Sequence, residues 1–209
     1  MRIAGIDPGL RSGALVVVQS RPERVLASAS LVEEGGAARE AKRRVTEIAE
    51  ALGGWSDKEF ASACLRADEW MRRFRQAFEA AEKEHGEIDY VACESFVDQP
   101  SRASQEKAGL LRKRWQTPLL TGYLNVYLAE RGYTIENGRL VFQSAGVVIK
   151  QLAEELGVLK RGRPSARERV ISGASLVRND HERKALAHAM ALRLRLARYG
   201  DPAQKRSQV

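Results

Sequence analysis

The chain has 209 residues, 44% hydrophobic and 30% charged, so it can form a buried core and does not have the composition of a disordered protein. Its 35 Lys and Arg residues outnumber 27 Asp and Glu residues, which gives a net charge of +8. A basic domain of this kind favours DNA or RNA as a partner, and the alternative is that the charge serves only solubility. Two distant cysteines, Cys64 and Cys93, exclude a disulfide framework and a zinc module. The sequence shows no signal peptide and no apolar run long enough to span a membrane, so we expect a soluble cytoplasmic protein with no membrane contact.

Three short strands are predicted at the start of the chain. Residues 3–7 form an apolar run, residues 13–18 form a β-branched run, and residues 25–32 alternate large and small side chains. The sequence Pro-Gly-Leu-Arg-Ser between the first two runs is typical of a tight turn. Three consecutive short strands predict an antiparallel meander.

Helices are predicted next. Residues 37–52 have helical spacing, and Ser56 and Asp57 can cap a long helix that ends near residue 84. In that helix Trp70, Phe74 and Phe78 recur every four residues and form one apolar stripe, which we expect to pack against a sheet.

The second half of the chain alternates strands and helices. We expect a strand over residues 88–96 and another over 139–142. The remaining predicted elements are a helix over 103–131 interrupted near 117–118, a helix over 144–157, a basic loop over 159–169, a weak helix over 168–177, a helix over 181–198 and a polar, disordered tail over 200–209. This order predicts an α/β domain with a mixed sheet. The opening meander argues against a Rossmann fold, and neither its glycine motif nor a phosphate-binding loop is present.

Two acidic residues end the most apolar strands. Asp7 comes directly before Pro8-Gly9, and Glu94 ends the run Val-Ala-Cys-Glu-Ser. If the two strands are neighbours, the carboxylates meet at one edge of the sheet, where they repel each other unless a divalent cation lies between them. Mg²⁺ prefers such oxygen ligands and can activate water for phosphodiester hydrolysis. The alternatives are a turn aspartate and a surface salt bridge.

The opening sequence IAGIDPGLRSGALVVV closely resembles the start of RuvC-type Holliday junction resolvases of the ribonuclease H-like superfamily. Glu94 matches the second carboxylate of that family. The resemblance implies a ribonuclease H-like α/β fold with a mixed five-stranded sheet flanked by helices, in one domain over residues 1–199. Residues 36–86 are longer than the family needs and predict a helical insertion.

The final helix matches the family less well. Aligning its Ala-Leu-Ala sequence places His181 and Lys184 at two metal-binding positions of the family. A neutral imidazole can bind a metal, but an ammonium group has no lone pair to offer. Three interpretations stay open: Lys184 replaces one cation, Asp180 supplies the missing carboxylate, or the protein binds junctions without cutting them. His188 follows His181 by seven residues, and a proton shuttle, a phosphate contact and simple packing are all open for it.

The resemblance also implies a DNA-binding surface between the fifth strand and the final helix. Basic groups there neutralise phosphates, and Phe96 can stack on a base or wedge into a junction. The predicted DNA-binding residues are Arg11, Phe96, Arg112, Lys113, Arg114, Lys150, Lys160, Arg161, Arg163 and Arg167. A solvated run of charge is the alternative.

The sequence therefore predicts a metal-dependent endonuclease that cuts four-way DNA junctions as a homodimer. The predicted catalytic residues are Asp7, Glu94, His181, Asp180 and Lys184, and all of these except Lys184 are predicted metal ligands, for Mg²⁺ or alternatively Mn²⁺. A junction-binding protein without activity, a nuclease for RNA–DNA hybrids and an actin-like ATP-binding protein are the rival hypotheses. The family resemblance also makes a phage protein that acts in the host cytoplasm an open origin.

Overall fold

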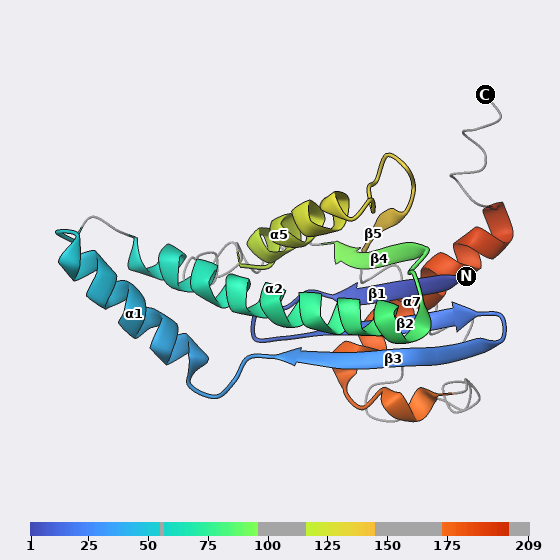
Figure 1. Cartoon of the computed structure of the whole chain (residues 1–209), viewed down its shortest axis with the longest axis horizontal. Helices are drawn as coiled ribbons and strands as arrows, with labels where there is room; N and C mark the ends of the chain where they lie inside the picture. The colour runs from blue at the N-terminus through green and yellow to red at the C-terminus, as the bar shows by residue number, and fades with distance from the viewer. Residues whose placement is uncertain (55–56, 96–115, 145–172, 201–209) are drawn as a thin grey trace, which may run out of the picture.

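A five-stranded sheet forms the centre of the molecule (Figure 1). The computed structural model describes residues 1–54, 57–95, 116–144 and 173–200. The strands are β1 (Arg2–Asp7), β2 (Ser12–Ser20), β3 (Glu23–Val32), β4 (Tyr90–Ser95) and β5 (Leu140–Ser144). They lie in the order β3-β2-β1-β4-β5, so β1, which carries Asp7, is the central strand.

The sheet is mixed, as predicted. β1, β2 and β3 pair antiparallel, which confirms the meander, whereas β4 pairs parallel with β1 and β5 pairs parallel with β4. Each strand begins or ends within about two residues of its predicted bounds. The parallel half of the sheet brings the carboxyl ends of β1, β4 and β5 to the same edge.

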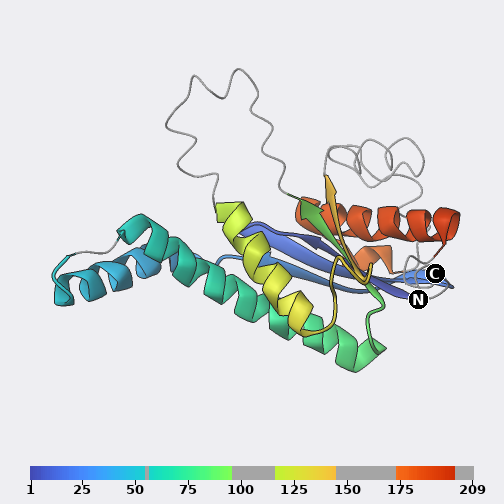
Figure 2. The same ribbon diagram turned by 90° about the horizontal axis from the view of Figure 1, so that it is seen from above.

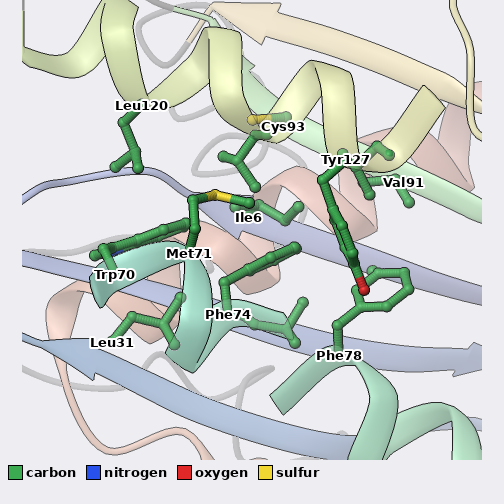
Figure 3. Close-up of a cluster of buried hydrophobic side chains, with 14 of the residues drawn as sticks. Ile6, Leu31, Trp70, Met71, Phe74, Phe78, Val91, Cys93, Leu120 and Tyr127 are labelled. Atoms are coloured by element: carbon green, nitrogen blue, oxygen red, sulfur yellow. The ribbon is translucent and has the colours of Figure 1, made fainter. Parts of the chain in front are cut away.

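Two helices cover one face of the sheet with large side chains. They are α2 (Lys58–His85) and α5 (Gln116–Glu130). Trp70, Phe74 and Phe78 of α2 are buried and stack along the helix, and Tyr127 of α5 meets Phe74 edge to face (Figure 3). This confirms that the aromatic stripe is a packing surface of the core.

The final helix, α7 (Asp180–Tyr199), covers the opposite face (Figure 2). It begins at Asn179, whose side chain accepts a hydrogen bond from the Glu182 amide at 2.9 Å, an ordinary N-cap. Its buried residues include the small, fully buried Ala185 and Ala189, which pack against the sheet. At these two alanines the helix backbone can come close to the central strand.

The remaining helix, α1 (Ala37–Ala51), packs on α2 and extends beyond the end of the sheet (Figure 1). Asp57 caps α2 by accepting from the Phe60 amide at 3.0 Å, as expected. The predicted helical insertion over 36–86 spans α1 and α2, and it stays a prediction. The described part of α5 has Pro118 in its first turn, where a missing amide hydrogen is tolerated.

Some predicted elements lie outside the described residues. They are the helix over 144–157, the basic loop over 159–169, residues 103–115 of the third helix and residues 201–209 of the tail. Of the predicted weak helix over 168–177, the described part is a short 3-10 turn, Ala174–Leu176. None of the helices in the described part of the chain is long and apolar enough to cross a membrane.

Candidate active site at the carboxyl edge of the parallel strands

Three polar residues form a row at the carboxyl edge of the sheet. Ile6 pairs with Cys93, so the next positions, Asp7 and Glu94, are neighbours across β1 and β4, and Glu94 pairs in turn with Gln143 of β5. Successive side chains alternate between the faces of a strand. Ile6 and Cys93 belong to the core under α2, so Asp7, Glu94 and Gln143 face α7. The predicted meeting of Asp7 and Glu94 is therefore confirmed.

Gly5 allows α7 to approach this row closely. A Cβ atom at position 5 would lie 1.8 Å from the carbonyl oxygen of Ala185 and 2.9 Å from the amide nitrogen of Ala189. No side chain fits there, so helix and strand backbones are in direct contact. This contact places His181, one turn before Ala185, over the end of β1.

His181 joins Asp7 to Ser12. The Nδ1 atom of His181 lies 2.7 Å from Oδ2 of Asp7, and its Nε2 atom lies 2.7 Å from Oγ of Ser12. An ionised carboxylate only accepts hydrogen bonds, so Nδ1 donates to Asp7, and in the neutral ring Nε2 accepts from the Ser12 hydroxyl. The buried Asp7 side chain thus fixes the orientation of the imidazole and its tautomer.

Glu94 titrates far from the usual range of a carboxyl group. Burial, followed by the hydrogen bond and the negative charge of Asp7, raises the pKa of Glu94 to about 8, and the nearby positive charge of Lys184 opposes this rise. At neutral pH, without a cation, the carboxyl pair therefore retains a proton. A pair of this kind is one that a divalent cation can stabilise in place of the proton.

His188 lies behind Glu94 and is completely buried. Its Nδ1 atom lies 3.0 Å from Oε1 of Gln143, and its Nε2 atom lies 3.9 Å from Oε2 of Glu94. Burial, with a smaller contribution from Lys184, lowers the pKa of His188 to about 4, against the opposing charge of Asp7. The ring is therefore neutral, and its Nε2 atom has no hydrogen-bond partner within the described structure.

Glu182 anchors the start of α7 on β3. It is buried, its Oε1 atom accepts from Oγ of Ser30 at 2.6 Å, and its Oε2 atom accepts from the Arg178 amide. Asn179 also donates to Oγ of Ser30, at 2.5 Å. These bonds fix the first turn of the helix, and with it the position of His181.

The structure places the other predicted site residues as follows. Asp180 has a side chain that is 82% exposed and pairs with Arg183 at 3.1 Å, so this geometry does not support its predicted role as a substitute ligand. Lys184 lies near enough to Glu94 and His188 to influence both pKa values.

Of the predicted DNA-binding residues, Arg11 is exposed in the turn between β1 and β2. The other predicted DNA-binding residues, Phe96, Arg112, Lys113, Arg114, Lys150, Lys160, Arg161, Arg163 and Arg167, lie outside the described residues.

This architecture is shared with a known protein. The structure of Thermus thermophilus RuvC in complex with a Holliday junction substrate matches it with a TM-score of 0.51 and 17% sequence identity, over 96% of this chain and 97% of that one. The chain has the ribonuclease H-like fold of RuvC. A second Thermus thermophilus RuvC structure is 20% identical over 96% of this chain and 98% of that one, with a TM-score of 0.48. No protein-family model and no curated protein sequence matches the chain.

The donor atoms at the site fit one hard cation. Asp7 and Glu94 offer carboxylate oxygens side by side, and Mg²⁺ is commonly held by one or two carboxylates together with water and substrate phosphates. Among the described residues, no group of three or more His, Cys, Asp or Glu side chains is arranged to hold a metal ion. The pair therefore suits an ion whose remaining ligands come from water and substrate.

Sequence reasoning missed two members of the site. The sequence places Ser12 only in a turn, and it places Gln143 in no predicted element, between the strand over 139–142 and the helix over 144–157. Neither has a sequence signal of its own, because Ser12 meets a residue 169 positions away and His188 is 45 positions from Gln143. For Gln143, the register between β4 and β5 is the observation that identifies it.

Proposed function

We propose that this protein is a structure-selective endonuclease that hydrolyses phosphodiesters of four-way DNA junctions with the help of a divalent cation. The observation that carries the proposal is the pair Asp7 and Glu94, brought together under α7 at the edge of a RuvC-like sheet. The similar RuvC structure contains a Holliday junction substrate, which supports junction DNA as the substrate class here.

Asp7 and Glu94 would hold the cation, which is Mg²⁺ in this proposal and alternatively Mn²⁺. The bound ion would supply Lewis acidity and a more acidic water molecule. The protein's own residues perform the remaining tasks. Asp7 orients His181, whose Nε2 atom bonds to Oγ of Ser12, and the close contact of α7 with Gly5 holds these groups together.

Lys184 would assist with the phosphate. It stands one turn after His181, and its positive charge already acts on Glu94. An ammonium group at this place can neutralise a substrate phosphate without binding a second metal ion. We also propose that the protein acts as a homodimer, because a four-way junction presents two strands to cut, and that it works in the cytoplasm.

A second candidate function is junction binding without cleavage. It is favoured by Lys184, which occupies a position where the sequence resemblance predicts a ligand, and by the absence of a three-ligand group in the described part of the chain. A nuclease for RNA–DNA hybrids differs from the main proposal only in substrate.

One experiment separates these functions. Labelled four-way junctions, linear duplexes and RNA–DNA hybrids are incubated with wild type, Lys184→Asp and the exposed-acid control Glu130→Gln, in Mg²⁺, Mn²⁺ or EDTA. We expect wild type and Glu130→Gln to cut the junction selectively and only with metal. Tight junction binding without cutting, together with cutting by Lys184→Asp, would favour the binding protein, and preferential cutting of hybrids would favour the third function.

A further inference from the structure

The charges of α1 are arranged against the dipole of the helix. Residues 39–44 contain four cations and one acid, whereas Glu47 and Glu50 lie in the second half of the helix, whose last turn has no basic residue. The amino end of a helix is positive and its carboxyl end is negative, so Arg39 in the first turn and Glu50 in the last turn are both unfavourable for the helix. The basic first half therefore does not serve the stability of α1.

One of these cations neutralises the nearest acids and leaves two others without a counter-charge. Arg43 binds the carboxylate of Glu40 at 2.6 Å and that of Glu47 at 2.5 Å. Arg39 and Lys42 are exposed, and neither makes an ion pair or a hydrogen bond with another residue in the described part of the chain. Their positive charges are therefore directed at solvent and are available to an anionic partner.

The basic half of α1 begins at the same edge of the sheet as the candidate active site. Val32, the last residue of β3, pairs with Ser12 at the start of β2, and the Glu33 amide donates to the carbonyl oxygen of Arg11 at 2.9 Å. The Ala37 amide then donates to the carbonyl oxygen of Glu34 at 3.0 Å, so the link from β3 to α1 is a tight turn. From this turn α1 extends beyond the end of the sheet (Figure 1). Its cations therefore continue outward from Arg11, which the sequence predicts to bind DNA.

Ion pairs with α2 hold the link between β3 and α1 in place. Arg66 of α2 pairs with Glu33, and the two side chains are only 11% and 16% exposed. Arg73 of α2 donates to the carbonyl oxygen of Val32 and pairs with Glu34 at 3.0 Å. The buried side of α1 also packs on α2. The helix is therefore fixed to the body of the protein, and a partner bound by its cations has a defined position relative to the active site.

We propose that Arg39 and Lys42 of α1 bind the phosphate backbone of a duplex arm of the DNA substrate. This inference rests on the proposed action on four-way DNA junctions, and it adds a surface that holds one arm as it leaves the active site. The two residues are three positions apart on a helix, so they are neighbours on its surface. Their long side chains can therefore contact the same stretch of backbone.

Charge complementarity selects the DNA backbone as the occupant of this surface. Duplex DNA carries about one negative charge per 1.7 Å of its axis, and cations that contact phosphates release the ions condensed on them. Such contacts position the duplex without reading its sequence. Arg39 and Lys42 lie on a different element from Asp7 and Glu94, so they contribute to binding and not to the cleavage step.

The test measures binding of a fluorescent four-way junction by anisotropy, in EDTA and over a series of salt concentrations. Wild type is compared with the double variant Arg39→Gln/Lys42→Gln and with the control Arg21→Gln/Lys83→Gln, which removes the same charges from exposed positions at the opposite edge of the sheet. In the α1 variant we expect the slope of log affinity against log salt to fall by about 1.8 for each bound protomer, at about 0.9 per phosphate contact. At about 0.1 M salt this corresponds to an affinity loss of about 10- to 100-fold. The control should keep the wild-type slope.

Two further measurements separate a DNA contact from a structural role. The α1 variant should melt at or above the wild-type temperature, because it loses cations from the positive end of a helix. A lower melting temperature with an unchanged salt slope would overturn the proposal. The single variants Arg39→Gln and Lys42→Gln should each lose about half of the change in slope, so the test does not depend on the folding of the double variant.

Failure of this inference differs from failure of the proposed function. A wild-type slope in the α1 variant, or an equal loss of slope in the control, would overturn the α1 contact alone. Junction cleavage in Mg²⁺ is measured on the same samples at saturating protein, where the α1 variant should cut at the wild-type rate. Loss of slope in the α1 variant without cleavage by wild type would support the contact and overturn the nuclease function, whereas wild type that does not bind the junction would overturn both.

Discussion

The two faces of the sheet are packed in different ways. The face under α2 and α5 is filled by large side chains such as Trp70, Phe74 and Phe78, which interlock and bury a wide apolar surface. On the face under α7, Ala185 and Ala189 pack directly against the backbone at Gly5. Close backbone approach lets short polar side chains on the helix reach those on the strands. The first face therefore chiefly stabilises the fold, and the second positions the candidate chemistry.

The largest expected effect is on the aromatic face. Phe74→Ala removes a fully buried ring that contacts Trp70, Phe78 and Tyr127, and we expect it to lower the free energy of unfolding by about 3–5 kcal/mol. Urea denaturation measures this. At urea concentrations below its denaturation midpoint, folded Phe74→Ala should cleave junctions at the wild-type rate. A lower cleavage rate in the folded variant would show that the two faces of the sheet are not independent.

Gly5→Ala tests the opposite face. The added methyl group meets the Ala185 carbonyl, so α7 must move away, and we expect a loss of about 1–3 kcal/mol, typical of overpacking. Unlike Phe74→Ala, this variant should lose activity while folded, because His181 moves with the helix. Cleavage at the wild-type rate by folded Gly5→Ala would contradict the role assigned to the close contact.

The pH dependence of stability reports on the site itself. In EDTA, the folded-state pKa of Glu94 is raised to about 8, so its contribution to stability is present below the unfolded value near 4.5 and is lost as pH rises through 8. Glu94→Gln has no such loss, so its melting temperature should exceed that of wild type more at pH 9 than at pH 5. A constant difference across this range would contradict the proton held by the carboxyl pair.

His188 gives the opposite trend. Its folded-state pKa is lowered to about 4, so its contribution is present above the unfolded value near 6.5 and is lost as pH falls through 4. The facing charged groups are Glu94, Asp7 and Lys184. Glu94→Gln, which keeps His188, should therefore still lose stability as the pH falls from 7 to 4. If the melting temperature of Glu94→Gln stays constant between pH 7 and pH 4, burial of a neutral His188 does not contribute to the pH dependence of stability.

The smallest effect is expected on the outward side of α7. Asp180→Asn removes an exposed charge at the helix start and its pair with Arg183, so the loss of stability should be about 0.3–1 kcal/mol. Junction cleavage should stay at the wild-type rate. A cleavage defect in Asp180→Asn would restore the ligand role that the sequence predicted for this residue.

The sequence predicted the strands, the aromatic stripe and the meeting of Asp7 with Glu94, because apolar periodicity and strand ends are local signals. It did not predict the exposure of Asp180 or its pair with Arg183, because helical spacing does not tell which part of a first turn faces solvent, and the ligand role of Asp180 stays a prediction. The short Asp180 side chain lies at the exposed helix start, whereas Glu182 is buried because β3 covers that side of α7. Ser12 and Gln143 depend on a turn and on strand register, which only the tertiary structure provides.

The most direct test of the carboxyl pair is junction cleavage by Asp7→Asn beside wild type and the exposed-acid control Asp68→Asn in Mg²⁺, with junction binding measured on the same samples. We predict that Asp7→Asn binds the junction as wild type does and cuts more than about 100-fold more slowly, beyond the 10–100-fold typical of residues that only support a metal ligand. Asp68→Asn should cut at the wild-type rate. Cleavage by Asp7→Asn at the wild-type rate would contradict the account.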